Sequence, residues 1–137
     1  MKNTLLLISI FLISLSMAYG HGSKHSSENT DHSGHESLEN EVTIKGQLVG
    51  LTCFIKHASK GPSHKDCFKE CAEKGLPIGI LTKDKKIYQI SGEGHAELSK
   101  TNKSFIKYAE EEVIAKGKVF SSNGMNMIVV KGIKKAN

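Results

Sequence analysis

Apolar and polar residues alternate along most of the chain, with the period of two that is typical of β-strands. The alternation is clearest in residues 42–51, which we expect to form a half-buried strand. Two short apolar runs, 77–81 and 86–90, flank a charged turn and predict a hairpin. Two longer runs, 113–120 and 125–133, flank an Asn-Gly pair, which is a strong hairpin signal. The pattern therefore predicts five strands.

Helical signals occupy two of the segments between these strands. Residues 64–74 follow Ser63, which is spaced from Asp66 as in a capping box, and a glycine and a proline come directly after them. We expect one short helix there. Residues 96–111 carry mixed helical signals, and the three glutamates 110–112 at their end are expected to be solvated.

The order of these elements predicts the fold class. Three strands, a helical segment and two further strands follow one another, as in an OB-type barrel. We expect a mainly β domain with short helices: a small five-stranded OB-like barrel with a helical insertion, rich in Cys and His, after the first strand. A small open sheet with helices on one side is the alternative, because periodicity does not distinguish the two.

The N-terminal segment 1–20 is typical of a signal peptide. Lys2 precedes an apolar stretch from Leu5 to Met17, and small residues at Ala18 and Gly20 predict cleavage after Gly20. The stretch is shorter than the roughly 18 apolar residues of a membrane-spanning helix. We therefore expect a periplasmic or secreted protein without an integral membrane segment in the mature chain.

Charge divides the rest of the chain into two parts. Residues 21–41 hold one Lys and five acidic residues, whereas residues 42–137 hold 17 Lys and nine acidic residues. The first part lacks apolar periodicity and predicts a disordered tail. Its four histidines indicate either a metal-collecting arm or a solvated linker: His21, His25, His32 and His35. Because no Arg is present and the chain is predicted to be exported, we expect no nucleic-acid partner.

All three cysteines and two histidines lie within one short stretch of the predicted domain. His64, Cys67 and Cys71 share one face of the predicted helix, because their spacings are three and four residues. Cys53 and His57 lie where the first strand ends. The connection between them and the predicted helix can fold back and bring them opposite that face. Three thiols with one of the two imidazoles would form a tetrahedral set for a soft metal ion. Copper is our first expectation and zinc the alternative.

Disulfide formation competes with metal binding. Cβ atoms four residues apart on a helix are about 5–6 Å apart, beyond the roughly 3.5–4.5 Å of a relaxed disulfide. Two thiolates at this spacing can bind one metal ion without such strain. Lys65 and Lys69 lie beside Cys67 and favour its thiolate form. A bridge from Cys53 to Cys67 or to Cys71 is the structural alternative.

Three resemblances accompany these residues. The run from Gly50 to Leu81, GLTCFIKHASKGPSHKDCFKECAEKGLPIGIL, resembles a motif of uncharacterised small exported bacterial proteins. The Cys67-x-x-x-Cys71 pair with a histidine is similar to the copper site of Sco-type proteins, which have a thioredoxin-like fold. Met125-x-Met127 resembles a pair used by periplasmic copper-binding OB proteins. The latter two resemblances imply copper as the ligand.

The sequence thus predicts an exported copper carrier or scavenger that is not an enzyme. Its partners would be the metal ion and a metal-receiving protein of the cell envelope. The competing prediction is a disulfide-stabilised interaction module of the envelope, whose basic domain docks on an acidic partner or on an anionic envelope surface.

Overall fold

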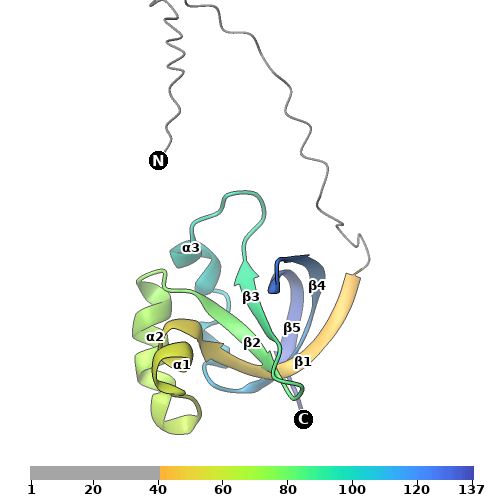
Figure 1. Cartoon of the computed structure of the whole chain (residues 1–137). Helices are drawn as coiled ribbons and strands as arrows, with labels where there is room; N and C mark the ends of the chain where they lie inside the picture. The colour runs from red at the N-terminus through yellow and green to blue at the C-terminus, as the bar shows by residue number, and fades with distance from the viewer. Residues whose placement is uncertain (1–40) are drawn as a thin grey trace, which may run out of the picture. The chain divides into compact units, whose positions relative to one another are not determined.

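Five strands close into a barrel in the computed structural model, which describes residues 41–137 (Figure 1). The strands are β1 (Glu41–Gly50), β2 (Ile78–Thr82), β3 (Ile87–Ser91), β4 (Glu112–Ser122) and β5 (Met125–Lys135). They follow one another around the barrel as β1-β2-β3-β5-β4, and β1 pairs with β4 to close it. Only the β3–β5 pairing is parallel among these strands. The OB-like barrel is confirmed, and the open-sheet alternative is wrong. The predicted signal peptide and tail lie outside the described residues.

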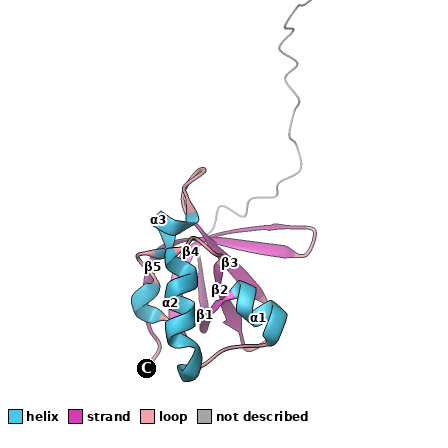
Figure 2. Cartoon of the chain, turned by 90° about the vertical axis from the view of Figure 1, so that its left-hand side faces the viewer, coloured by secondary structure: helices cyan, strands magenta, loops and turns pink. Residues whose placement is uncertain are grey.

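Short helices fill the two long connections. Between β1 and β2 lie α1 (Leu51–His57), a 3-10 turn (Pro62–His64) and α2 (Lys65–Glu73); between β3 and β4 lie α3 (Leu98–Asn102) and a second 3-10 turn (Ile106–Tyr108). The predicted helical insertion after the first strand is therefore confirmed. Helices α1 and α2 lie on the same flank of the barrel (Figure 2). No helix within residues 41–137 has the length and apolar character needed to cross a membrane.

Two local predictions differ from the structure. Leu51, expected at the end of the first strand, is the first residue of α1, and its N–H donates to the carbonyl of Pro77 at 2.9 Å. The predicted capping box is absent: His64 precedes α2, and no side chain caps that helix. The reason is that Pro62 begins a 3-10 turn, which places Ser63 inside the turn and leads directly into α2.

The core lies inside the barrel and beneath α2. Leu48, Ile80 and Val113 point inward from three strands, and Phe68 and Ala72 close the barrel end from α2; all five are fully buried. Phe68 and Ala72 are four residues apart, so they occupy one face of the helix. This burial fixes the orientation of α2 and leaves its other faces toward solvent.

Asn102 at the end of α3 attaches that helix to the end of α2. Its side-chain amide is fully buried and donates to the carbonyls of Ala72 and Leu76, both at 2.9 Å. These carbonyls belong to the last turn of α2 and the residues after it, where a helix leaves backbone acceptors unpaired. The carbonyl of Ala72 also accepts from the N–H of Gly75 at 3.0 Å, and that of Cys71 accepts from the N–H of Leu76 at 3.0 Å, so Asn102 reinforces a glycine cap at the end of α2.

Two glycines allow strands of the barrel to approach closely. A Cβ on Gly46 would lie 2.4 Å from the carbonyl oxygen of Leu81, and one on Gly117 would lie 2.2 Å from that of Val129. Gly117 also lies at a break in the register of β4 and β5. Any larger residue would push these neighbouring backbones apart, so both positions help the sheet to bend and close.

Glu41, the first residue of β1, forms ion pairs whose contribution to stability we expect to depend on pH. Its carboxylate lies 2.7 Å from Nζ of Lys116 and 3.0 Å from Nζ of Lys131. The hydrogen bond from Lys116, followed by that from Lys131, lowers the pKa of Glu41 from 4.5 to about 2. A carboxyl group with a lowered folded-state pKa stabilises the fold above its unfolded pKa, and this contribution is lost as the pH falls through the folded-state value.

We therefore expect Glu41→Gln to be less stable than the parent protein near neutral pH, with the difference vanishing as the pH falls from about 5 to about 2. Urea unfolding at a series of pH values measures it. Glu93→Gln serves as the control, because Glu93 is exposed and forms no ion pair among the described residues. A difference that is independent of pH would contradict the prediction.

Candidate metal centre

Three cysteine sulfurs gather on the flank of the barrel that carries α1 and α2. Sγ of Cys53 lies 3.8 Å from Sγ of Cys67, and the sulfurs of Cys53, Cys67 and Cys71 all lie within 4.8 Å of one another. Two thiolates bound to one metal ion with bonds near 2.3 Å are about 3.8 Å apart in tetrahedral geometry. This group, called here the sulfur cluster, could therefore hold a metal ion.

Local structure places each sulfur. β1 ends at Gly50, and α1 begins at once, so Cys53 lies in its first turn. Cys67 and Cys71 lie four residues apart on α2 and share a face, beside the buried face of Phe68. Burial of Phe68 therefore turns both thiols toward α1.

Burial disfavours the charged form of two thiols in the cluster, Cys53 and Cys71. Burial, followed by the contact with Cys67, raises the pKa of the Cys53 thiol to about 11. Burial is also the largest cause that raises the pKa of Cys71. A bound cation would favour the thiolate form instead, because a thiol that coordinates a metal ion is deprotonated. Metal binding at the cluster would thus release protons.

The lysines of α2 are engaged elsewhere. Nζ of Lys65 pairs with Glu111, and Nζ of Lys69 pairs with Asp66 at 3.2 Å. The expectation that these two lysines favour the thiolate form of Cys67 considers only their position along the helix. It leaves out the two ion pairs. The pair of Lys69 with Asp66 has the i, i+3 spacing of helical ion pairs, whereas the pair of Lys65 with Glu111 joins two segments that are distant in the chain.

The two histidines of the domain that were predicted as ligands do not join the sulfur cluster. Neither His57 nor His64 places a ring nitrogen within 4.8 Å of all three sulfurs. His57 is exposed at the end of α1. His64 is mostly buried, and its Nδ1 lies 2.8 Å from Oε1 of Glu110. The remaining predicted ligands fall outside the described residues: His21, His25, His32 and His35.

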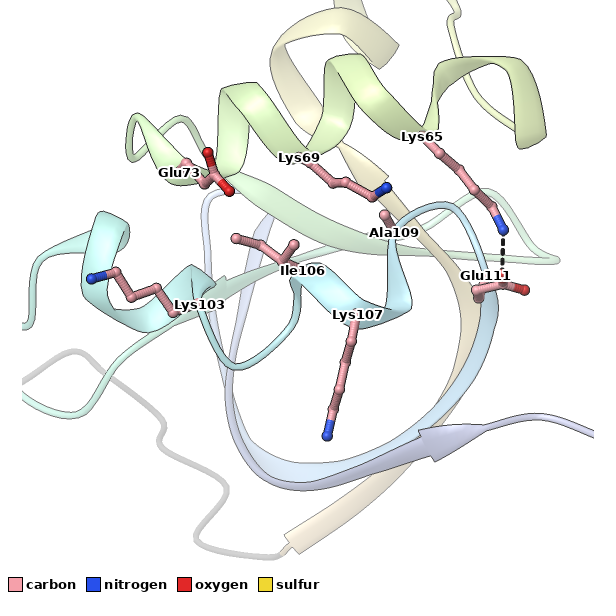
Figure 3. Close-up of a pocket in the computed structure, with 8 residues that line it drawn as sticks. All are labelled: Lys65, Lys69, Glu73, Lys103, Ile106, Lys107, Ala109 and Glu111. Atoms are coloured by element: carbon pink, nitrogen blue, oxygen red, sulfur yellow. Dashed lines mark hydrogen bonds and ion pairs between the residues drawn. The ribbon is translucent and has the colours of Figure 1, made fainter.

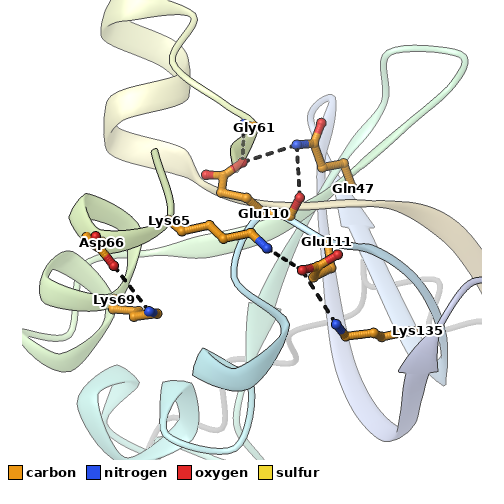
Figure 4. A network of polar contacts seen from close by, with 8 residues as sticks. All are labelled: Gln47, Gly61, Lys65, Asp66, Lys69, Glu110, Glu111 and Lys135. Carbon is orange, nitrogen blue, oxygen red and sulfur yellow. Dashed lines mark hydrogen bonds and ion pairs between the residues drawn. The ribbon is translucent and has the colours of Figure 1, made fainter. Parts of the chain in front are cut away.

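Glu110 is a buried carboxylate that sequence reasoning missed. Its side chain is fully buried, and Oε2 accepts from the N–H of Gly61 at 2.8 Å and from Nε2 of Gln47 at 3.2 Å (Figure 4). The expectation of a solvated glutamate is wrong here. Glu110 also has a positive φ of 59°, so it lies in a turn before β4 rather than at a helix end. Through these contacts it ties the segment before α2 to the barrel.

No protein-family model, curated protein or solved structure matches this chain. The function is therefore argued from the geometry of its sites, because a fold by itself does not determine function.

A basic hollow lies along a different face of α2. It has a volume of about 760 Å³ and is lined by Lys65, Lys69, Glu73, Lys103, Ile106, Lys107, Ala109 and Glu111 (Figure 3). Lys65, Lys69 and Glu73 are spaced by four residues, so they form one stripe of the helix, two residues out of phase with the cysteines. We call this surface the lysine hollow. It gathers four of the 17 lysines of residues 42–137 on one face.

The Met-x-Met pair lies on the start of β5. Met125 and Met127 are 72% and 39% exposed, so neither side chain belongs to the core. Met125 lines a hollow of about 420 Å³ together with Ile55 of α1. The two thioethers therefore form an exposed sulfur-bearing surface on a strand, whereas all three thiols lie on helices.

Proposed function

We propose that this protein is an exported carrier of a soft transition metal ion, copper in the Cu(I) state, and that the sulfur cluster holds the ion. The observation that carries the proposal is the approach of three thiol sulfurs from two helices to within 4.8 Å of one another. Thiol sulfurs at such distances can bind one soft metal ion together.

The number and softness of the ligands favour Cu(I). Structural zinc sites in proteins are almost always four-coordinate, and the sulfur cluster offers three ligands from the described residues. Cu(I) accepts three thiolates, and thiolate is the ligand that selects it. Zinc would need a fourth donor, from water or from a histidine that moves.

Exposure of one ligand favours carriage over permanent storage. Cys67 is exposed, whereas Cys53 and Cys71 are half-buried. A ligand from a receiving protein can therefore approach the ion beside Cys67 and take it by stepwise exchange. In this proposal, the predicted signal peptide directs the protein to the cell envelope, and the histidines of the tail collect the metal there.

Copper titration of the reduced protein tests the proposal. We expect about one Cu(I) per chain to be held against a competing chelator, and Cys67→Ser with Cys71→Ser to weaken binding by at least about 100-fold, because two of three ligands are lost. The matched control replaces both exposed thioethers, Met125→Leu with Met127→Leu, and should leave the affinity unchanged. Equal affinity in the cysteine double variant and the parent protein would refute the proposal.

The lysine hollow favours a second candidate function. Four lysines line it against two glutamates, so an acidic surface of a partner would be attracted there. In this alternative, a disulfide from Cys53 stabilises an interaction module and no metal is carried. Protein purified from its own compartment distinguishes the two: bound copper with free thiols supports the carrier, and a permanent Cys53 disulfide without metal supports the module.

A further inference from the structure

Cys53 and Cys67 form a cross-helix thiol pair with the geometry to become a disulfide. Their sulfurs are 3.8 Å apart, and a disulfide brings them to about 2.05 Å. Only Leu51 of α1 is buried, so little packing resists a small shift of this helix toward α2. The pair can therefore close through movement of α1 alone.

The other cysteine of α2 is a poorer partner for Cys67. Cys67 and Cys71 lie on the same helix, where Cβ atoms four residues apart are about 5–6 Å apart, and a relaxed disulfide needs about 3.5–4.5 Å. Closing that pair would distort a helix that is anchored by buried Phe68 and Ala72. The structure thus favours the link between helices over the link within α2.

Exposure decides which thiol meets an external reactant first. Cys67 is exposed, whereas Cys53 and Cys71 are half-buried. A bulky disulfide from outside can reach Cys67 without any opening of the structure. Sγ of Cys53 lies 3.8 Å from Sγ of Cys67, close enough for a second step.

We propose that Cys53 and Cys67 are a redox-active pair whose substrates are external disulfides, and that closing the pair empties the metal site. The first part stands on the sulfur geometry alone. The second part rests on the proposed function, because it requires that the sulfur cluster holds the ion.

The reaction takes place in two exchanges. The Cys67 thiolate attacks one sulfur of R–S–S–R, forming a mixed disulfide and expelling RS⁻, which takes up a proton. The Cys53 thiolate, after giving its proton to solvent, attacks Sγ of Cys67 and expels the second RS⁻. Two protein thiols are oxidised by two electrons, and one external disulfide is reduced to two thiols. Cys71 remains a free thiol.

Closing this bond removes two of the three sulfur ligands at once. A disulfide sulfur carries no negative charge and binds metal ions far less well than a thiolate. The single thiolate left on Cys71 cannot hold the ion against competing ligands. Reduction by an external dithiol reverses the step and restores the site.

Treatment of the purified protein with oxidised glutathione tests the pair. The number of free thiols should fall from three to one per chain, and peptide mapping should find the bond between Cys53 and Cys67. Cys53→Ser should stop at glutathione attached to Cys67, because the resolving thiol is missing. Cys71→Ser is the matched control and should form the same bond as the parent protein. A bond between Cys67 and Cys71, an adduct on Cys71 in Cys53→Ser, or no reaction would overturn the assignment.

Cobalt(II) reports on release of the metal. Thiolate–cobalt bonds absorb in the near ultraviolet, and the histidines of the tail do not contribute to that band. We expect oxidised glutathione to reduce the band at least about tenfold and dithiothreitol to restore it. A band that persists after the bond has closed would overturn the release step. If the reduced protein gives no cobalt band, release is followed instead with Cu(I) held against a competing chelator; if the reduced protein holds no Cu(I) either, the proposed function fails, whereas the mapped disulfide is judged separately.

Discussion

Phe68→Ala lowers the free energy of unfolding by about 3–5 kcal/mol, the usual cost of truncating a buried aromatic residue. Phe68 is fully buried and joins α2 to the core of the barrel. The residue before it is Cys67, so a loosened α2 also carries two of the three sulfurs out of position. Chemical denaturation of the metal-free protein measures the loss.

Ile55→Ala is the matched control for this prediction. Ile55 lies two residues after Cys53 but is 70% exposed, so its truncation should change the stability by less than about 0.5 kcal/mol. Saturating metal should recover part of the loss in Phe68→Ala, since a ligand at 100 times its Kd adds about 2.7 kcal/mol. A Phe68→Ala protein as stable as Ile55→Ala would show that α2 contributes little to the fold.

Glu110→Ala should cost about 3 kcal/mol, because it removes a fully buried acceptor from several donors at once. The N–H of Gly61 and the ring of His64 would lose their partner, whereas the amide of Gln47 would keep its bond to the backbone carbonyl of residue 110 at 3.3 Å. Each unsatisfied buried donor costs about 1–3 kcal/mol, and relaxation of the exposed loop limits the total. Equilibrium unfolding measures the effect, and increased hydrogen exchange at Gly61 would show where it arises.

Two further variants separate the hydrogen bonds from the backbone strain. Glu110→Gly also loses the acceptor, but it relieves the positive φ of 59°, so it should be about 1 kcal/mol more stable than Glu110→Ala. Glu110→Gln keeps a side-chain oxygen that accepts hydrogen bonds, so its free energy of unfolding should fall the least of the three variants. If Glu110→Ala and Glu110→Gln were equally stable, the hydrogen bonds at this site would not support the fold.

The barrel could be predicted because its signals are local. Alternation of apolar and polar residues and the Asn-Gly turn predicted β1 and the hairpin of β4 and β5 nearly to the residue. The helix expected over 64–74 is observed as α2, and the shared face of Cys67 and Cys71 follows from helical spacing alone. The sequence did not decide between a closed barrel and an open sheet. Which strands pair depends on the whole sheet, and local periodicity does not report it.

The sequence by itself determined the strands, the helix and the position of two thiols on one face. Only the tertiary structure decided that Cys53 joins them, because a shift of α1 by one residue, a rotation of about 100°, would have turned its thiol elsewhere. The same holds for His64, which the sequence left as a candidate ligand and the fold pairs with Glu110, 46 residues away in the chain. Local periodicity reports which face of an element is apolar, whereas the meeting of distant polar groups depends on how those elements pack.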